Sequence, residues 1–128
     1  ASYHGIPQKY FDKGDPYHCY CHKTTRLISE KFNSIKIKTT FQSRFGPQEW
    51  LQPYTDKTLE NLPKEGVKNV LTICPGFASD CVETLEEIQI QAKESFLNSG
   101  GENFDMVPCL NDNNDHITLL KSLIERNT

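Results

Sequence analysis

Three acidic side chains recur along the stretch from Leu71 to Ile88, which reads LTICPGFASDCVETLEEI. Asp80, Glu83 and Glu87 are spaced i, i+3 and i+7, so on an ideal α-helix they share one face. A face with these carboxylates suits a divalent cation such as Fe²⁺. The acids also favour a helix N-terminus, where Asp80 and Glu83 match a capping box. The spacing alone therefore leaves a metal-handling face and a structural cap both open.

A histidine near the start of the chain could work with these acids. His4 ends a short predicted strand and precedes a Gly-Ile-Pro turn. Open α/β sheets bind ligands at the carboxyl ends of their strands. If this strand neighbours the one that ends at Cys74, His4 and Glu83 face one crevice. An imidazole and a carboxylate there could take up protons or bind a metal ion. The alternative is a structural role, which is the more frequent one for a lone histidine.

The loop from Gln42 to Pro53 leaves the same edge of the predicted sheet. Loops of this length in compact domains are usually functional. Phe45, Trp50 and Tyr54 could line an apolar slot for a flat ligand, or they could pack on the core. Arg44 could pair with an acidic group of a ligand or with a neighbouring side chain.

A second group of metal-ligating residue types is His18-Cys19-Tyr20-Cys21-His22. His18 and His22 are spaced i, i+4 and share a helix face, but Cys19 and Cys21 at i, i+2 do not. No second cluster completes a tetrahedral set of ligands, so the geometry of a zinc site is missing. Whether these four residues bind anything stays open.

The composition excludes several classes of protein. The net charge is −3 and no basic stripe is present, so nucleic acid is not an expected partner. No apolar run is long enough for a membrane-spanning helix, and no glycine pattern of a dinucleotide or P-loop site occurs. The 5 cysteines lack scaffold spacing and indicate thiols of a reducing compartment, with Cys74 and Cys81 expected to be buried. We therefore expect a cytoplasmic protein.

The elements that must position these residues alternate along the chain. Apolar patterning and capping signals predict strands at 1–4, 35–41, 67–73 and 104–110, and helices at 16–32, 55–62, 80–98 and 115–127. Strict alternation predicts an α/β fold, a Rossmann-like parallel four-stranded sheet with helices on both faces. The strand at 67–73 should be buried on both faces. The last helix should turn Ile117, Leu120, Leu123 and Ile124 inward. The first strand looks cut short, so we expect a piece of a longer protein.

Five ordered motifs resemble one enzyme family closely. They are SYHGIP at 2–7, GDPY at 14–17, TFQSRFG at 40–46, WLQPYTD at 50–56 and CPGFASDCVETLEE at 74–87. Together they resemble ferrochelatase, nearly end to end, and the chain is similar to the C-terminal half of the proteobacterial type. This implies that residues 1–128 form the C-terminal α/β domain of a two-domain ferrochelatase whose N-terminal domain is absent from the chain.

The resemblance implies a function and site residues. Ferrochelatases insert Fe²⁺ into protoporphyrin IX to form protohaem, the last step of haem biosynthesis. The family's invariant histidine falls on His4 and its essential glutamate on Glu83, as catalytic and metal-handling residues. Asp80 and Glu87 fall on a path for protons or metal, along a helix that the family widens locally into π form. Ser43 and Trp50 fall in the wall of the porphyrin cleft.

The resemblance also sets expectations for partners and cofactors. The partners are protoporphyrin IX, Fe²⁺ and the missing N-terminal half, and peripheral association with a membrane is left open. No permanently bound cofactor is expected, and no [2Fe–2S] cluster, because the chain ends without a cysteine-rich tail. The isolated chain should be inactive. The alternatives are a non-catalytic iron- or haem-binding module and a chelatase for coproporphyrin or another metal.

Overall fold

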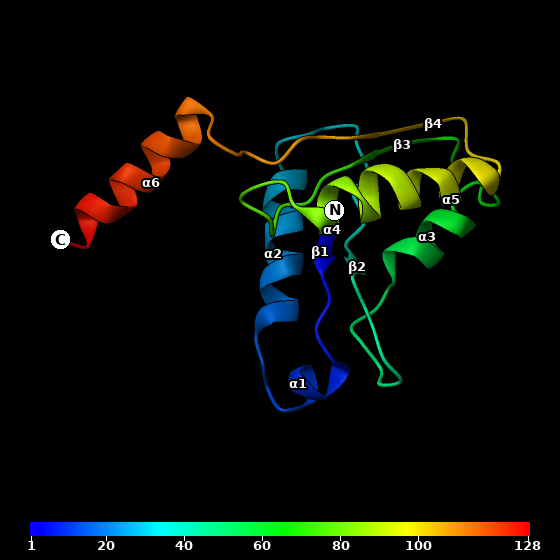
Figure 1. Ribbon diagram of the computed structural model, residues 1–128, viewed down its shortest axis with the longest axis horizontal. Helices are drawn as coiled ribbons and strands as arrows, with labels where there is room; N and C mark the ends of the chain where they lie inside the picture. Colours follow the sequence, from blue (N-terminus) through cyan, green and yellow to red (C-terminus); the bar gives the residue numbers. More distant parts are fainter.

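The computed structural model describes all residues 1–128 as a mixed α/β domain (Figure 1). The strands are short: β1 Ser2–His4, β2 Thr40–Gln42, β3 Asn69–Thr72 and β4 Asn103–Met106. The helices are α1 Gln8–Asp12, α2 Tyr17–Ser29, α3 Thr55–Asn61, α4 Val82–Leu85, η1 Glu87–Ala92, α5 Lys93–Asn98 and α6 Asn114–Arg126. The predicted alternation of strands and helices is therefore observed, but with an additional short helix, α1, and with shorter strands than the sequence pattern indicates.

The strands form two parallel pairs. β1 pairs with β2, with His4 opposite Gln42, and β3 pairs with β4, with Thr72 opposite Met106. One backbone hydrogen bond joins the pairs, because the amide of Ser2 donates to the carbonyl of Ile73 at 2.9 Å. The predicted single four-stranded sheet is thus not confirmed. Two sheets of two strands are observed, and a ladder between β1 and β3 is missing beyond this one bond.

Two of the predicted strands differ from expectation in extent or burial. The predicted strand at 35–41 shortens to β2, because β1 offers partners only to Thr40–Gln42. The predicted strand at 67–73 was expected to be covered on both faces, and this is wrong. Leu71 in β3 is 61 % exposed, since no helix of the chain covers that face.

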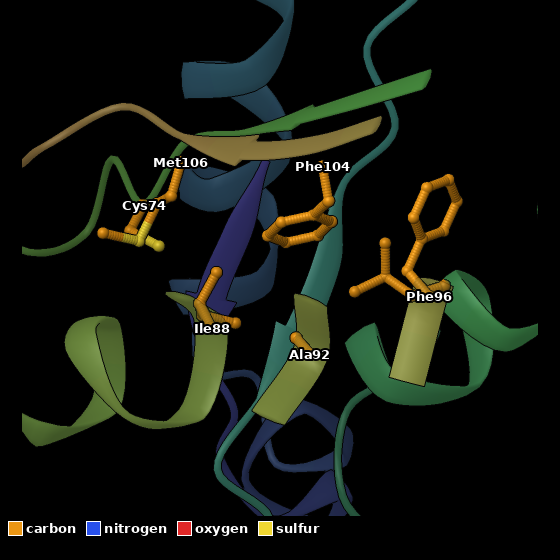
Figure 2. Close-up of a cluster of buried hydrophobic side chains, with 7 residues drawn as sticks. Cys74, Ile88, Ala92, Phe96, Phe104 and Met106 are labelled. Atoms are coloured by element: carbon orange, nitrogen blue, oxygen red, sulfur yellow. The ribbon is translucent and has the colours of Figure 1, made fainter. Parts of the chain in front are cut away.

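Two hydrophobic clusters lie on opposite sides of the β1–β2 pair. Side chains alternate along a strand, so Tyr3 and Phe41 pack with Cys21 of α2 while Gln42 faces the opposite side. The larger cluster lies between the β3–β4 pair and the helices η1, α5 and α3 (Figure 2). Its buried residues are Leu59, Cys74, Ile88, Ala92, Phe96, Phe104 and Met106. Helix α2 thus packs on one face of the β1–β2 pair, and on the other face Gln42 contacts Glu83 of α4 and Glu87 of η1.

Helix α6 extends away from the rest of the chain (Figure 1). Its apolar side chains were expected to face inward, and this is wrong: Ile117, Leu120, Leu123 and Ile124 are 42–64 % exposed. An apolar groove of about 1200 Å³ lies elsewhere, lined among others by Ile35, Leu71, Leu97 and Val107. No helix of the chain is both long enough and apolar enough to pass through a bilayer.

Candidate active site

His4 lies at the carboxyl end of β1, half-buried, with one ring nitrogen already engaged. Its Nδ1 lies 2.7 Å from the carbonyl oxygen of Gly5. A carbonyl oxygen only accepts hydrogen bonds, so Nδ1 carries the proton and neutral His4 keeps a lone pair on Nε2. The hydroxyl of Tyr17 donates to the backbone carbonyl of His4 at 2.8 Å and holds this residue from the side of α2. The free Nε2 can accept a proton or ligate a metal ion.

Glu83 lies in the first turn of α4, close enough to His4 to sense its charge. A hydrogen bond from Cys81 is the main cause that lowers the pKa of the Glu83 carboxyl, followed by its own backbone amide and the charge of His4. Glu83 is therefore ionised at neutral pH. This influence of His4 agrees with the predicted proximity of the two residues, and the amide of Ser2 in β1 donates to the carbonyl of Ile73 just after β3. The catalytic roles of His4 and Glu83 stay a prediction.

The helix that carries the acids widens in its middle. α4 is followed by the π-helix η1 and then by α5. The amide of Gln91 donates to the carbonyl of Glu86 at 3.0 Å, a bond that spans five residues. This confirms the π form that the resemblance implied. The spacing i, i+3, i+7 therefore does not describe a single α-helical face, since the predicted helix at 80–98 starts only at Val82.

Asp80 precedes the helix and has its own partners. Its carboxylate accepts from the side-chain amide of Asn111 at 2.8 Å, from the hydroxyl of Thr84 at 3.0 Å and from the backbone amide of Cys109 at 3.3 Å. The bond from Asn111 is the main cause that lowers the pKa of Asp80. The capping box predicted for Asp80 and Glu83 is wrong, because Cys81 caps α4 and donates its amide to Thr84.

Glu87 and Ser43 contact each other directly. The backbone amide of Ser43 donates to one carboxylate oxygen of Glu87 at 2.7 Å, and the Ser43 hydroxyl donates to the other. Ser43 adopts a φ of 64°, in the left-handed region that non-glycine residues rarely occupy. The carboxylate of Glu87 holds the backbone in this conformation at the point where the loop leaves β2. Sequence reasoning named both residues but did not pair them.

The aromatic residues of the loop are mostly engaged within the chain. Trp50 is 6 % exposed and donates its indole N–H to the carbonyl of Phe45 at 3.0 Å, while the ring of Phe45 is 76 % exposed. Arg44 lies over the ring of Tyr54 and pairs with Asp56 at 2.6 Å. Of the alternatives for Arg44, the neighbouring side chain is observed. Trp50 and Tyr54 thus have partners within the chain, whereas the ring of Phe45 is open to solvent.

In the histidine-cysteine cluster of α2, the two histidines lie together and the two cysteines lie apart, as their spacing predicts. The rings of His18 and His22 lie 4.4 Å apart, while Cys19 is exposed and Cys21 is buried. No group of three or more histidine, cysteine, aspartate or glutamate side chains in the chain is arranged to hold a metal ion. All of the cysteines are free thiols. The expectation that Cys74 is buried is confirmed, and Cys81 is half-buried.

One residue of the site was missed from the sequence. Gln42 is 2 % exposed and contacts the backbone of Glu83, the carboxylate of Glu87 and the hydroxyl of Ser2. An amide at an inward-facing strand position beside β-branched and aromatic residues was the available signal. The apolar groove, by contrast, includes neither His4 nor Glu83 among its lining residues.

Comparisons with known proteins agree with these observations. The family model described as Ferrochelatase matches residues 1–128. Among curated proteins, the chain is 58 % identical to the ferrochelatase of Rhizobium meliloti (strain 1021), a match that covers 98 % of this chain and 38 % of that protein. It is 57 % identical to the ferrochelatase of Marinobacter nauticus, a match that covers 98 % of this chain and 35 % of that protein. The chain thus spans little more than a third of the length of these relatives.

Proposed function

The chain belongs to the ferrochelatase family, and on that premise we propose that it supplies one wall of a porphyrin cleft in which Fe²⁺ is inserted into protoporphyrin IX. The reaction forms bonds between iron and the pyrrole nitrogens, breaks two pyrrole N–H bonds and releases two protons. No electrons are transferred. The observation that carries the proposal is the juxtaposition of His4, with an open Nε2, and the ionised carboxylate of Glu83.

His4 and Glu83 divide the chemistry in this proposal. His4 presents Nε2, which accepts a pyrrole proton or ligates the incoming metal ion. Glu83 presents a half-buried carboxylate that attracts Fe²⁺ while the metal ion loses its water ligands. Asp80 and Glu87 provide the path for protons or metal along the helix, and Ser43 and Trp50 belong to the cleft wall. The hydrogen bonds of Glu87 to Ser43 support a place for both at one edge of the cleft.

The rest of the catalytic protein is also part of the proposal. The chain covers about 38 % of the Rhizobium meliloti relative, so a second α/β domain of the same polypeptide is the proposed partner for the other wall. The exposed apolar face of α6 and the apolar groove support further packing outside this chain. The proposal places the reaction in the cytoplasm, uses iron only as substrate and includes no [2Fe–2S] cluster.

The test uses the longer protein that contains this chain. Purified protein, protoporphyrin IX and Fe²⁺ under reducing, oxygen-free conditions should yield protohaem, followed by its absorbance. Glu83→Gln and His4→Ala should each lower the rate at least about 100-fold, since single catalytic groups contribute about 10²–10⁴. Circular dichroism should show that both variants are folded. Near-normal rates in both would contradict the site assignment.

The same assay separates the alternative functions. Tight binding of iron or haem without product would favour a binding module. Faster metallation of coproporphyrin, or of protoporphyrin with Co²⁺, would favour a related chelatase.

A further inference from the structure

Gln42 is a buried polar side chain placed between the proposed catalytic residues. It is 2 % exposed and ends β2, directly opposite His4 in the parallel ladder. Its own carbonyl accepts from the amide of Gly5 at 2.8 Å. The backbone of Gln42 therefore fixes the strand end that carries His4, while its side chain points toward the helix that carries Glu83.

Both the oxygen and the nitrogen of the Gln42 carboxamide form hydrogen bonds. Its oxygen accepts from the hydroxyl of Ser2 at 2.6 Å, and the thiol of Cys74 lies at 3.9 Å. Its nitrogen donates to the backbone carbonyl of Glu83 at 2.6 Å and to the carboxylate of Glu87 at 3.2 Å. A carbonyl and a carboxylate only accept hydrogen bonds, so the nitrogen must face them. The orientation of the amide is fixed by the chemistry of its partners.

The position of these bonds along the helix gives them a specific role. The carbonyl of Glu83 lies in α4, just before the helix widens into η1, and the carboxylate of Glu87 belongs to the first residue of η1. Backbone hydrogen bonds change register across such a junction, and π segments are frequent at functional sites. A donor held by β2 and aimed at both positions fixes where the junction lies relative to the β1–β2 edge.

We infer that Gln42 is a positioning residue that sets the separation of Glu83 from His4 by holding the start of the π segment against the end of β2. This inference rests on the proposed function. Gln42 acts through the backbone of Glu83 and touches no reacting atom of the substrate in this scheme. Displacement of a catalytic group by about 1 Å can cost about 100-fold in rate, so loss of the bonds should be visible in turnover.

The test measures metallation by the longer protein with Gln42→Met, which keeps the length of the side chain but removes both donor and acceptor. We expect kcat to fall about 10- to 100-fold while KM for porphyrin changes less than about threefold. Gln42→Asn keeps the amide but is too short to reach Glu83, so it should lower kcat by a similar factor. It replaces Gln42→Met in the test if the methionine variant fails to fold. Thr40→Val, a buried polar residue of the same strand that contacts Thr55, should keep kcat within about threefold.

A double-mutant comparison separates positioning from general stability. If Gln42 acts through Glu83, Gln42→Met should add less than about threefold to the loss caused by Glu83→Gln, because coupled residues are not additive. Full additivity of the losses, or equal losses from Gln42→Met and Thr40→Val, would overturn the inference. If Glu83→Gln itself stays active, the proposed function fails. If Glu83→Gln is inactive while Gln42→Met and Gln42→Asn turn over normally, only the role of Gln42 fails.

Discussion

Gly5 is the position where one added carbon should disturb the site most. A Cβ at Gly5 would lie 2.9 Å from the carbonyl oxygen of Gln42 and 3.2 Å from the indole carbon Cε3 of Trp50. Neither neighbour can yield easily. The oxygen belongs to the backbone of β2, and Trp50 is 6 % exposed with its N–H bonded to Phe45. The peptide between His4 and Gly5 must therefore move instead.

The magnitude follows from the packing. Overpacking of a well-filled site costs about 1–3 kcal/mol, so Gly5→Ala should lower the free energy of unfolding by about that amount. The same shift displaces His4, so the rate of metallation should fall about 10- to 100-fold. Urea unfolding followed by circular dichroism measures the first quantity, and protohaem formation by the longer protein measures the second. Gly76→Ala is the matched control, because its Cβ would meet only Tyr3 at an ordinary 3.4 Å. Equal stability and rate for Gly5→Ala and Gly76→Ala would refute this reasoning.

Three further predictions concern stability, thiols and the isolated chain. Asp80→Asn should destabilise the fold by about 1–3 kcal/mol, because a charged acceptor of several hydrogen bonds is lost, and urea unfolding at pH 7 measures this. The difference in unfolding free energy from wild type should shrink as the pH falls through the lowered pKa of Asp80, where its carboxylate becomes protonated. Burial raises the pKa of Cys74 to about 12, so its thiolate is scarce at pH 8. Iodoacetamide should therefore label the exposed Cys19 before Cys74, which peptide mass spectrometry can measure. Faster labelling of Cys74 would contradict this prediction. Residues 1–128 alone should not insert Zn²⁺ into protoporphyrin, a reaction followed by porphyrin fluorescence, and measurable insertion would show that one wall suffices.

The sequence pattern predicted the alternation of strands and helices, except for the short helix α1, and it predicted that His4 and Glu83 lie near each other. His4 is the last residue of β1 and the turn before Glu83 follows β3, and ligands bind at the carboxyl ends of such parallel strands. The separation of the sheet into two pairs was not predictable, because hydrophobic patterning identifies a strand without specifying its partner. The same limit applies to α6, whose amphipathic pattern predicted the helix correctly but not what covers its apolar face.

The acids show where spacing arguments fail. An i, i+3, i+7 pattern assumes a uniform α-helix, whereas the chain starts its helix at Val82 and widens it at Glu87. Nothing in the residue types at this junction distinguishes α from π hydrogen bonding. The π form was expected only from family resemblance. Besides Thr84, the partners of Asp80 are Asn111 and Cys109, about thirty positions further along the chain, and such long-range hydrogen bonds leave no local signal.

The single backbone bond between Ser2 and Ile73 has a consequence for motion. Each strand pair has its own hydrogen-bonded ladder, and this one backbone bond is the seam between the two pairs. His4 lies on one side of this seam, and the helix with Glu83 follows the strand on the other. A change in the angle between the two pairs would change the distance between His4 and Glu83 while both ladders stay intact. The amide of Gln42 spans the seam, so it limits how far the two halves of the site can separate.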